Sequence, residues 1–248
     1  MIYCSIRDFS FRKDMLSMNE LAVSKQFFGF LVRYIMNNKQ SSDGFRKKPV
    51  QMAIKRVFDI VASFVLILLF FAIPVFIVVP ILICATSKGP AVFTQERVGR
   101  NGKIFKIFKF RTMLIPEERI MADGTALEPN DSITGVGNWL RKTSIDELPQ
   151  LFNILIGDMS FCGPRPMLPY QVDKIEESQK IRHVMRPGIT GLAQVMGRNN
   201  LEWDQKLKYD VDYIQQFSLL FDIKIFLKTV KVVLKHEGIE YVHTLSKD

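Results

Sequence analysis

The sequence predicts an α+β fold that is mostly helical, in which a re-entrant membrane helix carries a small cytoplasmic domain and interfacial amphipathic helices. Three observations predict it. No charged residue occurs between Ile60 and Ser87, and both flanks of this apolar run are rich in lysine and arginine. The chain after the run shows strand-like alternation first and helical spacing later.

The predicted membrane helix spans residues 54–90. About 20 consecutive apolar residues suffice to cross a bilayer, so the run is long enough. Positive charge stays on the cytoplasmic side of a short membrane segment, and here both flanks are basic, which favours a helix that enters, breaks and returns. Pro74 lies near the middle of the run and removes a backbone hydrogen bond. A kinked single span is the alternative.

Two further segments have the pattern of amphipathic helices. Residues 217–235 carry Lys224, Lys228, Lys231 and Lys235 at spacings of four, three and four, which places them on one side of a helix. Such a helix suits the membrane interface, and packing against the protein's own core is equally compatible with the pattern. Residues 20–36 are a second candidate.

Residues 91–113 predict a β-hairpin with a turn at Arg100, Asn101 and Gly102. Lysines alternate with phenylalanines in this stretch, a pattern that suits single-stranded nucleic acid as well as phosphate groups or lipid headgroups. Residues 116–134 are polar and contain proline and glycine, so a loop is expected there.

A helix is predicted to begin near Ser144–Asp146, because Leu148, Leu151, Phe152 and Leu155 have helical spacing. Ser144 and Glu147 fit a capping box, whereas Pro149 favours a later start. In either register Asp146 and Glu147 would lie in the first helical turn, where unpaired N–H groups stabilise a carboxylate. The pair could act as a nucleophile or hold a cation, or it could serve only as a cap.

Arginines surround this acidic pair in the sequence. Arg141 precedes it by five residues, and Arg165 lies between two prolines that restrict its backbone, a setting that suits bidentate contact with a phosphate. Arg186 opens a glycine-rich segment, residues 186–199, whose free backbone amides could cradle phosphates. Carboxylates, arginines and exposed amides together indicate phosphoryl chemistry.

Composition narrows the classes of function. The formal net charge of +9 favours anionic partners such as headgroups or phosphorylated substrates. Three cysteines are too few and too scattered for a disulfide framework, and the three histidines lack the spacing of zinc ligands.

Several segments, in this order, resemble the bacterial sugar transferase family, the monotopic phosphoglycosyl transferases. The matching segments are KRVFDI (55–60), FTQERVGRNGKIFKIFKFRTM (93–113), LRKTSIDELPQLFNILIGDMSFCGPRP (140–166), RPGITGLAQVMGR (186–198) and WDQKLKYDVDYI (203–214). The resemblance runs from about Ile54 to Gly238 and is specific because all segments occur together. The family's membrane helix breaks at a serine–proline pair, which here is Ile73-Pro74.

The resemblance implies a two-step reaction. Asp146 would attack the β-phosphate of a UDP-sugar, and undecaprenyl phosphate would then take the sugar phosphate from Asp146, with Glu147 acting on the acceptor. Mg²⁺ near Asp146 would neutralise the diphosphate. The substrate contacts implied by the family pattern are Lys109, Arg111, Arg141, Arg165 and Arg186.

The resemblance also implies the organisation of the chain and its location. Residues 1–53 are expected to form an N-terminal extension, partly helical, of which the first fifty residues lie outside the resemblance; residues 91–238 are expected to form the catalytic domain and residues 239–248 a C-terminal tail. The expected location is the bacterial inner membrane with the catalytic domain facing the cytoplasm, in contact with membrane lipids and not with nucleic acid; a homo-oligomer is compatible with the pattern. A non-catalytic basic membrane adaptor is the alternative function.

Overall fold

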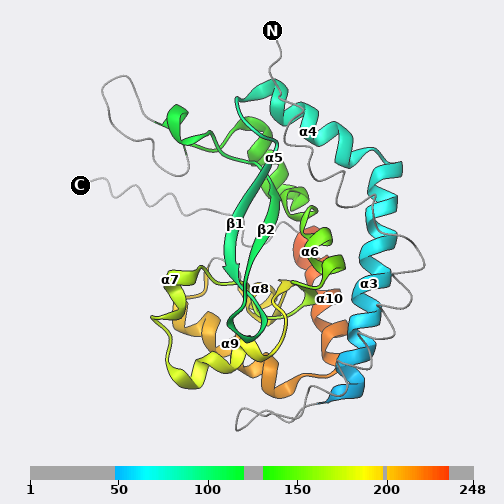
Figure 1. The fold of residues 1–248 in the computed structure, drawn as a ribbon, viewed down its shortest axis with the longest axis vertical. Helices are drawn as coiled ribbons and strands as arrows, with labels where there is room; N and C mark the ends of the chain where they lie inside the picture. The colour runs from blue at the N-terminus through cyan, green and yellow to red at the C-terminus, as the bar shows by residue number, and fades with distance from the viewer. Residues whose placement is uncertain (1–47, 120–130, 198–199, 235–248) are drawn as a thin grey trace.

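The computed structural model describes residues 48–119, 131–197 and 200–234. The predicted helix at residues 20–36, the tail at 239–248 and Arg198 lie outside these ranges. The described part is mostly helical with two small two-stranded sheets, which confirms the predicted α+β class (Figure 1).

A bent pair of helices forms one side of the molecule (Figure 1). Helix α3 spans Pro49–Ala72 and α4 spans Val75–Thr86, with a bend of 61° at the predicted break, Ile73-Pro74. The helix starts at Pro49, before the predicted Ile54, because a proline is tolerated in the first helical turn. In the described part of the chain no single helix qualifies as a membrane span, whereas this bent pair qualifies by length and composition.

The predicted hairpin is confirmed. Strand β1 (Val92–Val98) pairs antiparallel with β2 (Ile104–Phe110), from Val98 opposite Ile104 to Val92 opposite Phe110. The turn between them is a 3-10 turn, η2 (Arg100–Gly102). Asn101 and Gly102 adopt positive φ values of 56° and 77°, a region that asparagine and glycine tolerate better than other residues.

The segment after the hairpin is more helical than the sequence suggested. The predicted loop at 116–134 contains a 3-10 turn, η3 (Pro116–Arg119). Helix α5 (Gly135–Thr143), which was not predicted, follows it with Thr134 as N-cap: the Thr134 hydroxyl accepts from the N–H of Gly137 at 2.9 Å.

Of the two helix starts that the sequence left open, the capping box at Ser144 is not formed. Ser144 makes no side-chain cap, and residues Ile145–Glu147 form a separate 3-10 turn, η4, before helix α6 (Gln150–Ile156). Pro149 is the N-cap of α6, so the argument for a later helix start was correct. Asp146 and Glu147 therefore lie in the turn that joins α5 to α6, and not in the first turn of α6.

The remaining elements form a second layer beside the hairpin. Strand β3 (Ser160–Cys162) pairs parallel with β4 (Gly188–Thr190). Between and after them come α7 (Pro169–Val172), η5 (Glu177–Val184), α8 (Leu192–Met196), α9 (Trp203–Gln216) and α10 (Leu219–Leu234). The helix predicted within residues 217–235 is thus confirmed as α10 over Leu219–Leu234, whereas Phe217 ends α9 and Lys235 lies outside the described residues.

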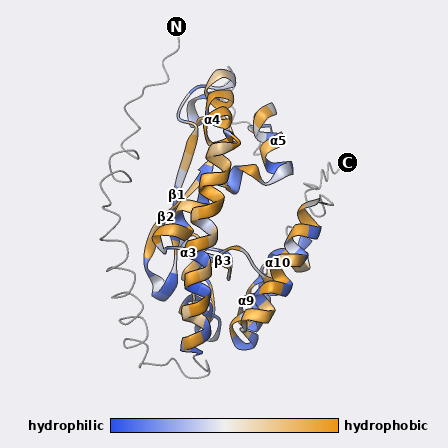
Figure 2. Cartoon of the chain, turned by 90° about the vertical axis from the view of Figure 1, so that its right-hand side faces the viewer, coloured by the Kyte–Doolittle hydropathy of each residue, from blue (hydrophilic) through white to orange (hydrophobic). Residues whose placement is uncertain are grey.

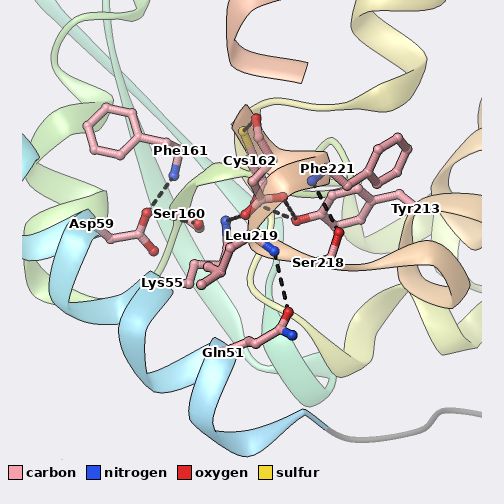
Figure 3. Close-up of polar contacts among 11 residues, drawn as sticks. Gln51, Lys55, Asp59, Ser160, Phe161, Cys162, Tyr213, Ser218, Leu219 and Phe221 are labelled. Atoms are coloured by element: carbon pink, nitrogen blue, oxygen red, sulfur yellow. Dashed lines mark hydrogen bonds and ion pairs between the residues drawn. The ribbon is translucent and has the colours of Figure 1, made fainter. Parts of the chain in front are cut away.

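Three charged side chains attach the start of α3 to α6, β3 and α10. Both terminal nitrogens of Arg56 donate to carbonyls at the end of α6, those of Ile154 at 2.6 Å and Leu155 at 2.9 Å. Asp59 accepts from the hydroxyl of Ser160 and the N–H of Phe161, both at 3.1 Å. Lys55 pairs with Asp222 of α10 at 2.5 Å (Figure 3).

The bent helix pair packs by one face and exposes the other. Ile67 is buried against the cluster that contains Phe105, Leu151 and Phe152, and Val79 and Ile83 are buried against Phe110 and Leu140. Large apolar side chains on the opposite face are 42–69% exposed on α3 and α4, among them Phe58, Phe64, Leu68, Ile77 and Ile81. Hydropathy colouring makes the face visible along both helices (Figure 2).

Gly137 is expected to be required for the packing of α5. A Cβ atom there would lie 2.0 Å from the backbone oxygen of Thr112, whereas a Cβ at Gly135, in the same helix, would meet nothing within 4 Å. Overpacking against rigid backbone typically costs about 1–3 kcal/mol. Gly137→Ala should therefore lower the melting temperature in a thermal-shift assay in detergent, and Gly135→Ala should leave it unchanged or raise it. Equal melting temperatures for the two variants would contradict this packing.

Candidate active site

A single large cavity contains the predicted acidic pair and most of the predicted basic residues. Its volume is about 1580 Å³, and its walls come from the hairpin, the α5–α6 connection, and helices α8, α9 and α10. Asp146, Glu147, Lys109, Arg111, Arg141 and Arg165 all line it. Arg186 is the one predicted site residue that does not.

Asp146 is placed by a strained turn. Ser144, at the end of α5, adopts a left-handed conformation with φ 57°, which costs an ordinary residue roughly 1–2 kcal/mol. Arg141 in α5 and Asp146 in η4, on either side of this residue, both line the cavity. The strained residue lies two positions from the proposed nucleophile, where such conformations are often found.

The carboxyl of Asp146 has a pKa raised from 3.8 to about 6. Burial is the largest cause, because it disfavours the charged form, and the neighbouring carboxylate of Glu147 adds to it. Lys109 and Arg141 act in the opposite direction and limit the rise. Near neutral pH the group is therefore mostly ionised, and it is more basic than an ordinary aspartate.

Glu147 lies between two cations. Its Oε1 is 2.7 Å from Nζ of Lys109 on β2 and 3.7 Å from a terminal nitrogen of Arg165. The register of the hairpin places Lys109 beside the acidic turn, because β2 packs against η4 and α6. The Arg165 side chain is about half exposed, so its guanidinium is accessible from the cavity.

Three other arginines are fixed by the protein itself. The guanidinium of Arg111 donates to the backbone carbonyls of residues 87–90, with 2.7 Å to that of Pro90, so it holds the chain where α4 ends and β1 approaches. Nε of Arg186 donates to the carbonyl of Gly157 at 2.7 Å, at the end of α6. Arg141 donates from Nε to the hydroxyl of Thr112 at 2.9 Å.

A buried ion pair supports the turn that carries Arg165. Arg182 of η5 pairs with Asp210 of α9, and both are at most 4% exposed. Arg182 also donates to the carbonyl of Arg165 at 2.7 Å, and Arg97 donates to that of Pro166 at 3.1 Å. The backbone around Arg165 is therefore held from two sides.

These supporting residues were not predicted from the sequence. Arg182 and Asp210 are 28 positions apart, and no local motif links them. One signal was available: Asp210 lies on the apolar stripe of α9 with Leu207, Tyr213 and Ile214, all buried, and a carboxylate in that position requires a buried partner.

The cavity carries a surplus of positive charge. Among the described residues, its cationic side chains are Arg97, Lys109, Arg111, Arg141, Arg165, Arg182 and Lys206, and its carboxylates are Asp146, Glu147 and Asp210. Seven cations against three anions suit a ligand with several phosphate charges. No group of three or more histidine, cysteine, aspartate or glutamate side chains in the described chain could hold a metal ion by itself.

Several known proteins are similar to this chain in sequence. The profile of the family described as "Bacterial sugar transferase" matches residues 50–236. The chain is 44% identical over 195 residues to the galactosyl transferase CpsE of Streptococcus agalactiae, covering 74% of this chain and 43% of that protein. It is 39% identical over 190 residues to the UDP-glucose:undecaprenyl-phosphate glucose-1-phosphate transferase of Escherichia coli, covering 73% of this chain and 40% of that protein.

A shorter relative matches over nearly its whole length. The uncharacterised sugar transferase EpsL of Bacillus subtilis is 41% identical over 198 residues, which cover 79% of this chain and 95% of that protein. The chain thus spans less than half the length of CpsE and of the Escherichia coli enzyme, and the size of its matched unit is that of EpsL. The family profile spans most of the chain and includes every element that lines the cavity. This protein therefore belongs to the bacterial sugar transferase family.

Proposed function

We propose that this protein transfers a sugar 1-phosphate from a UDP-sugar to undecaprenyl phosphate, releasing UMP and starting the assembly of a polysaccharide or glycoconjugate. The observation that carries the proposal is the half-buried Asp146 carboxyl, with its pKa near 6, in a cavity with a surplus of cations. Family membership supports it, as does the activity named for the Escherichia coli relative. The named relatives act on different sugars, galactose and glucose, so the proposal covers the reaction and leaves the sugar open.

In the first step a carboxylate oxygen of Asp146 attacks the β-phosphorus of the UDP-sugar. The bond from that phosphorus to the bridging oxygen breaks, and UMP leaves with the electron pair. In the second step a phosphate oxygen of the lipid attacks the same phosphorus and displaces the Asp146 carboxylate. Glu147 orients the lipid phosphate or accepts its proton, and its own position is set by Lys109 and Arg165.

The cavity arginines and Lys109 bind the phosphates. Arg165 has an accessible guanidinium on a supported backbone, so it is suited to bidentate phosphate contact. Lys109 and Arg141 lower the cost of bringing a diphosphate beside an ionised Asp146. Arg111 contributes its charge from a fixed place at the cavity wall, and Arg186 acts at a distance by holding the end of α6.

Mg²⁺ is the proposed cofactor, with Asp146 as its protein ligand. Magnesium commonly binds through one or two carboxylates together with substrate phosphates, so a site with few protein ligands fits it. The ion would neutralise charge on the diphosphate. The 3-10 turn η4 holds Asp146 in the cavity. Its neighbours Lys109 and Arg141 would share with Mg²⁺ the role of neutralising the charge of the diphosphate.

The proposed location is the bacterial inner membrane, with the catalytic domain on the cytoplasmic face. The bent pair α3–α4 enters and leaves one leaflet, since its outward face is apolar and both flanks are basic. The outward face of α10 is apolar as well, with Leu220, Ile223 and Leu227 more than half exposed, and would lie in the interface. The proposed membrane-inserted part of the α3–α4 pair lies within residues 54–90, and the proposed catalytic domain comprises residues 91–238.

Asp146→Asn should abolish turnover, because an amide is a poor nucleophile. Wild-type protein mixed with UDP-sugar alone should gain the mass of a sugar phosphate on the peptide that contains Asp146, as measured by mass spectrometry. Asp173→Asn, an exposed carboxylate that does not line the cavity, is the matched control and should keep its activity. Substantial turnover in Asp146→Asn would refute the mechanism, and absence of UMP release by wild type across a panel of UDP-sugars would favour the non-catalytic adaptor.

Measured with subsaturating UDP-sugar and Mg²⁺, so that it reports the metal-free enzyme, the rate of UMP release should fall on the acid side with a midpoint near pH 6. The Asp146 carboxyl has a pKa of about 6, so below that pH it is protonated and cannot attack. The single-turnover rate should drop about tenfold per pH unit below the midpoint. Glu147→Gln removes a like charge and should move the midpoint to lower pH, since Glu147 raises the pKa of Asp146. A midpoint near 4 in the wild type would contradict a raised pKa.

Both flanks of the bent helix pair should lie on the cytoplasmic side. Cysteines placed at Lys47 and at Lys103, in a background without the native cysteines, should resist a membrane-impermeant thiol reagent in intact cells. Both should react once the cells are opened. External labelling at position 47 alone would show a straight span and would exclude the re-entrant arrangement.

A further inference from the structure

Helix α10 separates the cavity from an exposed apolar surface. Four of its residues line the cavity: Phe226, Thr229, Val232 and Val233. Five of its large apolar side chains are exposed: Leu220, Ile223, Phe226, Leu227 and Val230, with 44–72% of each accessible. Phe226 alone among the described residues of α10 belongs to both sets.

The spacing of these residues explains the overlap. Phe226, Thr229 and Val233 follow one another at intervals of three and four, which places them on one stripe of the helix. Ile223, Leu227 and Val230 form a neighbouring stripe by the same intervals. Lys224, Lys228 and Lys231 lie beyond it and are exposed. Passing around α10, the surface changes from cavity wall to exposed apolar stripe to lysines, with Phe226 at the first boundary.

Polar contacts fix α10 in this position. Asp222 pairs with Lys55 of α3 at 2.5 Å and accepts from the hydroxyl of Tyr213 of α9 at 2.8 Å (Figure 3). About two turns further along the helix, the hydroxyls of Thr229 and Thr190 lie 2.6 Å apart at the cavity wall. The edge of the cavity at Phe226 is therefore built on a helix attached to α3, α9 and β4.

We propose that this edge of α10 is the passage through which the polyisoprenoid tail of the lipid acceptor runs from the bilayer to the cavity, an inference that rests on the proposed function. The phosphate of such a lipid must reach the cations beside Asp146 while its tail remains in an apolar medium. The tail therefore has to cross the cavity edge along an unbroken apolar surface, which the Phe226 boundary offers. The adjacent lysines suit the anionic headgroups around the entrance.

A second apolar edge provides the competing location. Phe93 of β1 also lines the cavity and is 44% exposed, on the side where the chain leaves α4. Val92 beside it is also exposed and lines the cavity, but the next β1 residues are Thr94, Gln95 and Glu96, so this apolar edge is shorter than the stripe of α10. The structure therefore favours α10, and Phe93 serves as the alternative in the test.

The test compares Phe226→Ser with Leu227→Ser. Both variants lose one exposed apolar side chain from α10, and only the first loses cavity wall. We expect Phe226→Ser to raise the KM for undecaprenyl phosphate in vesicles about tenfold or more, since burying a phenylalanine is worth at least that factor. Leu227→Ser should raise it much less. The UMP burst with UDP-sugar alone should persist in both variants, which shows that they are folded.

Three outcomes would overturn the passage. Equal KM values for Phe226→Ser and Leu227→Ser would mean that Phe226 is an ordinary membrane contact. Loss of the UMP burst only in Phe226→Ser would assign Phe226 to the binding of the nucleotide sugar. A raised KM for undecaprenyl phosphate in Phe93→Ser alone would place the entrance at the hairpin. The proposed function fails separately, by the absence of a UMP burst in the wild type.

Photo-crosslinking gives a second readout that does not depend on catalysis. A benzophenone side chain introduced at position 226 should capture labelled undecaprenyl phosphate even with excess phospholipid in the vesicle. The same group at position 227 should capture mainly phospholipid. The same preference at both positions would exclude a specific passage at Phe226.

Discussion

The attachment of α3 through buried charges is the constraint on which the rest of the structure depends. Lys55 and Arg56 lie in one turn of α3 and Asp59 in the next, just before the uncharged run, and all three are at most 8% exposed. A buried charge that loses its partner typically costs about 3–5 kcal/mol, so each must meet its partner on α10, α6 or β3. The three partners come from distant parts of the chain, and their common contact with α3 fixes their relative positions.

This attachment divides α3 into two functional parts. The first turns belong to the domain by virtue of their polar contacts, and the later turns pack by one face and expose apolar side chains on the other. The apolar helix is therefore not an independent anchor joined by a linker. Its contacts with the hairpin and α6 hold the acidic turn at a fixed position relative to the proposed membrane surface.

Within the cavity, the fold maintains a carboxylate in unfavourable surroundings. Burial and Glu147 raise the pKa of Asp146, and surrounding cations limit the rise. Such a group is ionised near neutral pH and still basic enough to attack phosphorus, a balance typical of functional carboxylates. The left-handed Ser144 and the close approach of Gly137 to Thr112 are local costs of placing it there.

The sequence by itself determined the elements whose signals are local. Alternation and a turn motif predicted the hairpin, Pro74 the helix break, and lysine spacing the helix α10, and the order of motifs identified the family. It could not decide between a capping box at Ser144 and the later start at Pro149, because both patterns are local and compete. Only the tertiary structure showed that Arg111 holds backbone carbonyls, that Arg186 lies outside the cavity lining and that Arg182 and Asp210 support Arg165. Those roles depend on contacts between residues 15 or more positions apart, and such contacts exist only once the chain has packed.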